Sequence, residues 1–580
     1  MRHEFTVWAP AAKQVELVSG DQRVHMRPGE DGWWQVSVGG AGAGSRYAFS
    51  LDGGPSRPDP RSAFQPDGVH GPSEVVDHSA YPWHDAGWRG MPLPGAVLYE
   101  LHVGTFTPQG TFDAAIERLG HLVELGIDAI ELLPVAEFSG RRGWGYDGVD
   151  LYAPHHAYGG PEGLKRLIDA CHSAGIGVIM DVVYNHLGPA GNYLPQFGGY
   201  FSERHMTNWG EAVNLDGPGS DEVRRFVIDN ALMWLRDYHC DGLRLDAVHA
   251  LVDDSAMHIL EQLAVEVAAL GAHLRRPLFL IAESDLNDPR FVRSRDAGGY
   301  GLDAAWADEW HHALHTTLTG ERSGYYEDFG PLNLLAKALR QAWVYDGTWS
   351  PHRRRIHGRA PTGLSGHQFV VCTQNHDQVG NRAVGDRLSA LTSPGRLRVA
   401  AALLLTSPFV PMLFQGEEWG ATSPFQYFTD HEDPELGRAV SVGRRHEFAA
   451  FGWDPDQVPD PQDPATFVRS RLDWTEPAKQ PHAALLDWYR HLIALRKQIP
   501  ALTDGRLNRV HVDCDDQGGL IVRRGPVRVV SNLGTATWTV PVDSLVTVLA
   551  ASDPGITHDE GKLMLPPDTV AIIEDPADRA

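Results

Sequence analysis

Eight short apolar segments alternate with longer amphipathic ones between about residues 95 and 495, and this alternation constrains the fold more than any other feature. Residues 220–239, for example, repeat their apolar positions with a helical period. Strands that are hydrophobic on both faces, each followed by a helix, are typical of a parallel sheet covered by helices. A count of eight predicts a closed (β/α)8 TIM barrel of the α/β class. The expected strands are 97–106, 129–134, 177–183, 242–247, 279–284, 304–309, 369–377 and 411–418.

The segments on either side of this region have the short, turn-punctuated pattern of all-β domains. We expect an N-terminal Ig-like β-sandwich over 1–92, of the carbohydrate-binding-module kind, and a C-terminal β-sandwich over 501–580. The catalytic barrel would occupy 93–500, with an insertion at about 187–219 after its third strand. Trp33 and Trp34 of the first domain could stack on sugars, or they could belong to its core.

Composition narrows the class of protein. The chain has 580 residues, a formal net charge of −25 and no basic patch apart from 352–355, which argues against nucleic acid as a partner. Its four cysteines are scattered without a CxxC pair, so neither a disulfide framework nor a zinc site is indicated. It contains no run of 18 apolar residues and no signal-peptide pattern at its start. We therefore expect a soluble, cytoplasmic protein without a membrane partner.

Polar side chains gather at the carboxyl ends of five of the expected strands. Active sites of barrel enzymes lie at this end. Each residue alone has a structural explanation; Asp181, for instance, could simply accept hydrogen bonds, and Arg244 with Asp246 could be an ion pair. Convergence from five strands is better explained by an active site. The residues are Asp181, Asn185, His186, Arg244, Asp246, Glu283, Asp308, Glu309, Asn375, His376 and Asp377.

This set of side chains suits glycoside hydrolysis. That reaction needs one carboxylate as nucleophile or base and one carboxylic acid kept protonated by a raised pKa. A guanidinium beside the first keeps it ionised, and histidines can donate hydrogen bonds to the sugar. Metal-dependent hydrolysis is the competing chemistry, but HxH and HExxH spacings are absent from these strand ends. We expect neither a catalytic metal nor a cofactor.

Four segments resemble the motifs of the α-amylase superfamily of retaining glycosidases and transglycosidases: DVVYNH (181–186), GLRLDAVHA (242–250), the Glu of IAES, and QNHDQVG (374–380). The resemblance implies that Asp246 is the nucleophile, Glu283 the general acid/base and Asp377 the transition-state stabiliser. It also implies that Arg244, His186 and His376 line the sugar subsite. WGYDGVDLY (144–152) is similar to the family's loop after strand two and implies Tyr146 as a stacking platform, with Asp147 nearby.

Further features indicate a branch of this superfamily. FTVWAPAAKQVELV at the start is similar to the N-terminal domain of branching enzymes, isoamylases and maltooligosyltrehalose trehalohydrolases, and His249-Ala250 departs from the Lys-His of ordinary amylases. LFQGEEWGATSPFQYFTDH (413–431) resembles the trehalohydrolases. This implies cleavage of the α-1,4 bond beside the terminal α,α-trehalose unit of maltooligosyltrehalose. It also implies a functional pairing with a maltooligosyltrehalose synthase.

Candidates for recognising the trehalose end lie in the loops after strands six to eight: Asp308, Trp310, His311, Glu417 and Phe425. Calcium, common in amylases, is not indicated, because the insertion after strand three has no dense carboxylate cluster. Two alternatives stay open. One is a glucan branching enzyme, which would pass the glycosyl group to a sugar hydroxyl instead of water. The other is a glycan-binding protein on an inactive barrel.

Overall fold

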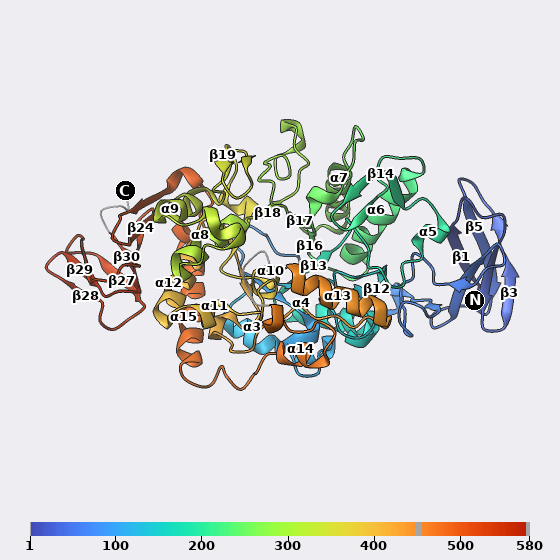
Figure 1. Ribbon diagram of the computed structural model, residues 1–580, viewed down its shortest axis with the longest axis horizontal. Helices are drawn as coiled ribbons and strands as arrows, with labels where there is room; N and C mark the ends of the chain where they lie inside the picture. Colours follow the sequence, from blue (N-terminus) through green and yellow to red (C-terminus); the bar gives the residue numbers. More distant parts are fainter. Residues whose placement is uncertain (1, 448–454, 576–580) are drawn as a thin grey trace.

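The eight expected strands form a closed parallel barrel in the computed structural model, which describes residues 2–447 and 455–575. The barrel lies between the N-terminal domain and the C-terminal domain (Figure 1). Neighbouring strands pair in parallel around the whole circle. In order around the barrel the strands are β9 (Leu98–Leu101), β10 (Ala129–Leu132), β13 (Gly177–Val182), β16 (Gly242–Leu245), β17 (Phe279–Ala282), β18 (Ala304–Trp306), β21 (Phe369–Cys372) and β22 (Val410–Phe414).

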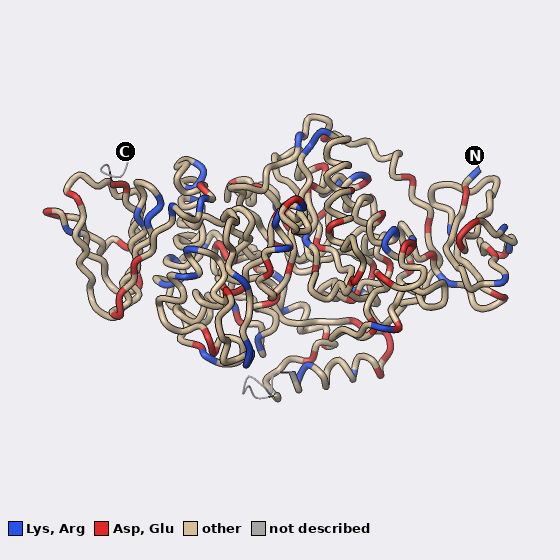
Figure 2. Tube along the Cα trace, turned by 90° about the horizontal axis from the view of Figure 1, so that it is seen from above, with Lys and Arg blue, Asp and Glu red and all other residues tan. Residues whose placement is uncertain are grey.

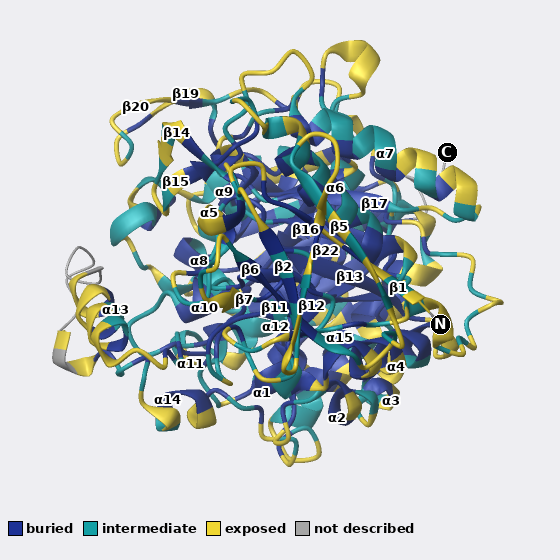
Figure 3. Cartoon of the chain, turned by 90° about the vertical axis from the view of Figure 1, so that its right-hand side faces the viewer, coloured by how far each residue is buried: buried dark blue, intermediate teal, exposed yellow. Residues whose placement is uncertain are grey.

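Every residue of these eight strands is buried, which explains their near-continuous apolar sequences. The buried strands form the centre of the molecule, and most exposed residues lie on the surrounding helices and loops (Figure 3). The first expected strand, 97–106, was too long: β9 ends at Leu101 and a short helix, α1 (Val103–Phe106), follows. The longer covering helices are α4 (Gly160–Ser173), α6 (Ser220–Arg236), α7 (Ile259–Leu274), α8 (Asp308–Thr319), α12 (Pro394–Leu405) and α15 (His482–Gln498).

The N-terminal domain is built from two small antiparallel sheets, ordered β1-β5-β4 and β3-β2-β6-β7. Trp34 in β5 is half-buried and donates its indole N–H to the carbonyl of Ala9 at 3.1 Å, as a packing residue does. Trp8 packs edge-on against Tyr200 of the barrel insertion, with ring centroids 5.3 Å apart. The strands are β1 (Arg2–Trp8), β2 (Val15–Ser19), β3 (Gln22–His25), β4 (Arg27–Pro28), β5 (Trp33–Gly39), β6 (Arg46–Leu51) and β7 (Ser56–Arg57).

Two excursions from the barrel carry hairpins. The insertion after β13 contains α5 (Leu194–Phe197) and a hairpin of β14 (Phe201–Thr207) and β15 (Gly210–Val213). The excursion between β18 and β21 contains α9 (Leu332–Gln341) and a hairpin of β19 (Asp346–Ser350) and β20 (Arg355–Gly358). Loops that leave a barrel between its strands are the usual carriers of substrate-binding residues.

The C-terminal domain has a five-stranded sheet, β23-β24-β25-β30-β27, and a three-stranded sheet, β26-β29-β28. Basic residues are interspersed with acidic ones along the chain (Figure 2). None of the helices within 2–447 and 455–575 has the length and apolar character needed to cross a membrane. The strands of this domain are β23 (Val510–Cys514), β24 (Gly519–Arg524), β25 (Val527–Asn532), β26 (Trp538–Pro541), β27 (Thr547–Ala551), β28 (Thr557–Asp559), β29 (Lys562–Leu565) and β30 (Thr569–Glu574).

Candidate active site

A cavity of about 650 Å³ is lined by residues that follow the carboxyl ends of the barrel strands. The three carboxyl groups expected to act in catalysis, Asp246, Glu283 and Asp377, all line it. Four of the expected sugar-binding residues line the same cavity: Tyr146, Asp147, His186 and His376. Sequence reasoning did not single out Trp144, Asn192, Phe201, Trp209, Glu211 and Tyr427, which complete parts of its wall.

Arg244 lies beneath the cavity and holds several of its carboxylates. Its side chain is fully buried, and Nη1 donates to Asp246 Oδ1 at 2.8 Å and to both oxygens of Asp181 at 2.9 Å. Its Nη2 is 3.6 Å from Glu283 Oε2. The guanidinium rests on the ring of Trp306, 4.2 Å from the centroid, in a cation–π contact. Charge-assisted hydrogen bonds of this kind fix the direction of the Asp246 carboxylate.

Glu283 has the properties of a carboxylic acid that keeps its proton. Burial raises the pKa of Glu283 to about 8, and the neighbouring Asp246 and Asp377 add to the rise, while Arg244 opposes it. The backbone N–H of Ala247 donates to Glu283 Oε2 at 2.5 Å. Ala247 adopts a left-handed backbone with φ of 39° directly after Asp246, and this turn brings its N–H to Glu283. Near neutral pH, Glu283 can therefore donate a proton.

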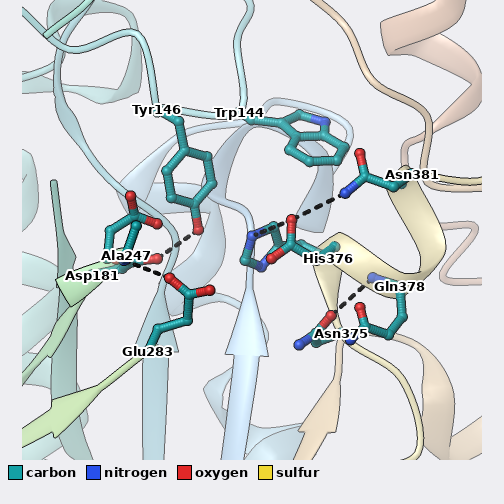
Figure 4. A network of polar contacts seen from close by, with 12 residues as sticks. Trp144, Tyr146, Asp181, Ala247, Glu283, Asn375, His376, Gln378 and Asn381 are labelled. Atoms are coloured by element: carbon teal, nitrogen blue, oxygen red, sulfur yellow. Dashed lines mark hydrogen bonds and ion pairs between the residues drawn. The ribbon is translucent and has the colours of Figure 1, made fainter. Parts of the chain in front are cut away.

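Tyr146 and His376 form one wall of the cavity with their rings nearly parallel, 5.1 Å apart at 21°. The hydroxyl of Tyr146 donates to Asp181 Oδ2 at 2.6 Å, and Figure 4 shows this hydroxyl directed at the Asp181 carboxylate. Burial raises the pKa of Asp181 to about 6, although Arg244 acts against the rise. Asp181 thus connects Tyr146 to Arg244, a positioning role that sequence reasoning left open.

Asp377 lies in the first turn of α10 (His376–Gly380), which begins directly after strand β21 and its short loop. The side chain of Asn375 caps this helix by accepting from the N–H of Gln378 at 3.0 Å. Asn381 donates to Asp377 Oδ1 at 3.3 Å. Asp377 has a side chain 39% exposed, so it remains available to a ligand in the cavity.

His186 marks the side of the cavity next to the insertion. Its Nε2 is 3.0 Å from the carbonyl oxygen of Tyr146, and its Nδ1 is 2.9 Å from the side-chain nitrogen of Asn185. The ring of Trp209, from the turn between β14 and β15, stacks on it at 5.1 Å and 8°. Trp209 is 47% exposed at the cavity rim, an aromatic surface of the kind that stacks on sugar rings. The only sequence signal for it was its place in the insertion.

Two of the residues expected to recognise the leaving group lie inside the protein. Trp310 and His311 occupy the first turn of α8 and are almost entirely buried, at 0% and 2% exposure. His311 donates from Nδ1 to the carbonyl of Thr373 at 2.7 Å. The helix begins earlier than a loop interpretation assumed, so this turn faces the core. Neither residue is placed to contact a sugar.

Glu417 and Phe425 also lie outside the cavity wall. Glu417 accepts hydrogen bonds from the hydroxyls of Thr373 at 2.6 Å and Tyr489 at 2.9 Å, deep in the barrel. Phe425 is fully buried and packs against Trp144, with ring centroids 5.2 Å apart. Its effect on the cavity is therefore indirect, through the position of Trp144.

Asp308 lines a second, narrow cavity of about 30 Å³ close to the catalytic carboxyl groups. Burial raises the pKa of Asp308 to about 7, and the charge of Asp377 adds to it. Arg353 from the β19–β20 turn bonds Asp285 at 2.9 Å on another wall. Other polar and aromatic residues of this cavity are Ser284, Asn287, Glu309, His312, Tyr325, Tyr345 and His352.

Within residues 2–447 and 455–575, two groups of side chains could hold a cation, and both lie apart from the catalytic carboxyl groups: Glu137 with His155 and His156, and His205 with Asp216 and Asp254. In the first, Nδ1 of His155 accepts from the N–H of Ala157 at 3.0 Å, so the proton of the neutral ring sits on Nε2. That nitrogen then has no lone pair for a metal. In the second, His205 and Asp216 already bond each other at 3.1 Å.

Comparison with known proteins decides the family. Residues 76–201, which include the first three barrel strands, match the family described as alpha amylase, catalytic domain. The malto-oligosyltrehalose trehalohydrolase of Arthrobacter ramosus is 55% identical over 547 residues, covering 93% of this chain and 94% of that protein. The chain belongs to the malto-oligosyltrehalose trehalohydrolase family. A solved structure described as a putative alpha amylase from Salmonella typhimurium is 40% identical, with a TM-score of 0.90 and coverage of 99% and 98%.

This chain is less similar to a branching enzyme than to the trehalohydrolases. The 1,4-alpha-glucan branching enzyme of Corynebacterium jeikeium is 28% identical to this chain and covers 72% of it, with 61% of its own length matched. The trehalohydrolase of Arthrobacter ramosus, by contrast, is 55% identical and is matched over 94% of its own length.

Proposed function

We propose that the protein is a retaining glycosidase that hydrolyses the α-1,4-glucosidic bond next to the terminal α,α-trehalose unit of maltooligosyltrehalose and releases trehalose. The observation that carries the proposal is the pair Asp246 and Glu283 around Arg244. The carboxylate of Asp246 accepts a hydrogen bond from the buried guanidinium at 2.8 Å, and Glu283, with its pKa raised to about 8, keeps a proton at neutral pH. A nucleophile and an acid with these separate environments are what a retaining mechanism requires.

The reaction follows from these positions. Glu283 gives its proton to the glycosidic oxygen while an oxygen of Asp246 attacks the anomeric carbon, so the carbon–oxygen bond to trehalose breaks as the glycosyl–Asp246 ester forms. The ionised Glu283 then takes a proton from water, whose oxygen attacks the same carbon and frees Asp246. Two inversions give net retention. The half-exposed Asp377 would hold the sugar hydroxyls in both steps.

The substrate is too large for the narrow cavity, so the two cavities have different roles. The larger one, with Tyr146, Trp209 and His186 on its walls, would hold the maltooligosyl part. The narrow one has room for only about two water molecules, so Asp308, Asp285 and Arg353 would border the leaving-group side without enclosing the trehalose part.

Release of trehalose implies a role in trehalose biosynthesis. Its substrate must come from an enzyme that turns the reducing end of a maltooligosaccharide into an α,α-linked pair, which is the activity of a maltooligosyltrehalose synthase. All four cysteines are free, as is usual in a reducing compartment, and we place the reaction in the cytoplasm.

Product analysis tests the proposal. Purified protein incubated with maltotriosyltrehalose should release trehalose and maltotriose, with the α-anomer of maltotriose formed first, as followed by proton NMR. Maltopentaose, a matched substrate without the α,α linkage, should react much more slowly. Asp246→Asn should remove nearly all turnover while its circular dichroism stays unchanged.

The same experiments separate the alternative activities. New α-1,6 linkages in amylose, without trehalose release, would indicate a glucan branching enzyme and contradict the proposal. Binding of maltotriosyltrehalose without turnover would indicate an inactive glycan-binding barrel. Release of β-maltotriose first would contradict retention.

A further inference from the structure

A buried carboxylate in the floor of the larger cavity has no part in the steps above. Glu100 lies in β9, is 1% exposed and directs both oxygens at one residue, His376. Its Oε1 is 2.6 Å from Nδ1 of the imidazole, and its Oε2 accepts the backbone N–H of His376 at 2.9 Å. The ring and the backbone of His376 are therefore fixed together by a single side chain from a neighbouring region of the barrel.

This contact determines which atoms of His376 carry protons. A carboxylate only accepts, so Nδ1 must hold a proton, and the other nitrogen, Nε2, faces the cavity side next to Asp377 Oδ1 at 3.5 Å. Burial alone would lower the pKa of His376, but the charges of Asp377 and Glu100 outweigh it and raise the pKa to about 9. At neutral pH the ring is an imidazolium whose Nε2–H is free to donate.

We propose that Glu100 is a positioning residue for glycoside cleavage, because it holds His376 as a cationic hydrogen-bond donor directed at the sugar in the cavity. The inference rests on the proposed function, since a fixed cationic donor contributes to rate only where negative charge or a polarised hydroxyl develops in a transition state. Figure 4 shows His376 beside Tyr146 and at the start of α10, on the cavity wall.

Other charged groups near His376 do not replace Glu100. Besides Glu100 they are Asp377, Glu131, Asp181, Asp308, Arg244 and His102. Burial raises the pKa of Glu131 well above its ordinary value, which distinguishes this neighbour from Glu100. Arg244 acts in the opposite direction, against the imidazolium. Among these groups only Glu100 contacts Nδ1.

Glu131 offers a matched control. It stands directly opposite Glu100 in the pairing of β10 with β9, and it is also 1% exposed. Within the described part of the chain, neither of its carboxyl oxygens has a hydrogen-bond partner. Glu131→Gln thus makes the same chemical change at the same depth of the barrel without touching His376.

The test compares Glu100→Gln with Glu131→Gln. A glutamine has one acceptor for the two donors of His376, so E100Q should loosen the ring and lower the pKa of His376. We expect kcat for trehalose release to fall on the order of ten- to a hundredfold, by analogy with the loss on removing a carboxylate that orients a metal-bound histidine. KM should change little. The alkaline limb of the pH–rate profile should move to lower pH, whereas E131Q should keep the wild-type rate and profile.

Equal kcat and pH limbs in E100Q and wild type would overturn the inference, as would an equal loss in E131Q. If E100Q does not fold, nitrogen-15 NMR of wild-type histidines decides, with His376 assigned from the spectrum of His376→Asn. Nδ1 of His376 should stay protonated through pH 8, and titration of the ring below pH 7 would overturn the inference. Failure of the proposed function can be told apart from failure of this inference. In that case wild-type protein would release no trehalose, whereas the NMR result for His376 would be unaffected.

Discussion

The proton on Glu283 gives the sharpest prediction, because its occupancy can be calculated. An ordinary glutamate, with a pKa of about 4.3, would be protonated in only ~0.2% of molecules at pH 7. With its pKa raised to about 8 by burial and by the neighbouring aspartates, Glu283 holds its proton in roughly 90% of molecules at that pH. The environment of this one side chain therefore raises the protonated, acid-competent fraction of Glu283 roughly 450-fold.

The perturbation is a rise in pH, and the assay is kcat/KM for trehalose release between pH 6 and 10. A group that acts as an acid is lost as pH rises through its pKa. The rate should therefore be level at neutral pH, bend near 8 and then fall about tenfold per pH unit. A maltooligosyl fluoride is the matched substrate, because fluoride leaves without a proton. Its kcat/KM, which reports only the first step, should not bend near pH 8.

Two results would refute the assignment. A rate that already falls above pH 5 would mean that Glu283 has an ordinary pKa in the working enzyme. An identical bend near pH 8 with the fluoride would mean that the titrating group is not the proton donor to the leaving oxygen. Titration of His376, whose pKa is raised to about 9, would affect both substrates and so can be told apart.

Two predictions concern stability. Leu243→Ala, in the fully buried strand β16, should lower the free energy of unfolding by roughly 2–5 kcal/mol in urea denaturation. The control Val123→Ala, at a 48% exposed position, should change it by no more than ~0.5 kcal/mol. Equal losses in the two variants would contradict the burial argument. His172 lies fully buried between Asp85 (2.8 Å) and Asp241 (3.0 Å); burial opposes its charge, but these carboxylates raise its pKa. Its contribution to stability is present below the unfolded pKa of about 6.5 and lost as pH rises through the folded value, so the unfolding free energy should fall less between pH 6 and 9 in His172→Gln than in wild type.

The sequence predicts the barrel well because its signal is local. Each strand is short and buried on both faces, so its apolar run survives whatever packs around it, and the polar residues that end it point to one face. Asp246, Glu283 and Asp377 follow from this rule together with the motifs. Glu100 also carries a local signal, because it is a charged residue inside the apolar run LYEL of β9. It lies within the strand, so a rule that considers only residues beyond strand ends does not select it.

Residues of the loops depend on partners far away in the chain, and there the sequence predicts less. Glu417 looks like a loop carboxylate, but Tyr489 of α15 and Thr373 of the loop after β21 hold it in the interior. Trp310 looks like a stacking residue, but α8 begins at Asp308 and turns it into the core. Trp209 reaches the cavity only because the β14–β15 hairpin folds back over His186. Tertiary contacts therefore determine whether these side chains are buried or reach the cavity.

The balance of charge around the cavity explains why the acid and the nucleophile can be the same kind of residue. Among the described residues, Arg244 lies against Asp246 and Glu283, and the imidazolium of His376 lies against Asp377. Arg244 gives its shortest bonds to Asp246 and Asp181. With more carboxyl groups than cations in a buried space, some must stay neutral. Glu283 meets the guanidinium only at 3.6 Å, and it is the group left with a proton. Burial, together with this longer contact to the arginine, leaves the proton on Glu283, whereas Asp246 bonds the same guanidinium at 2.8 Å.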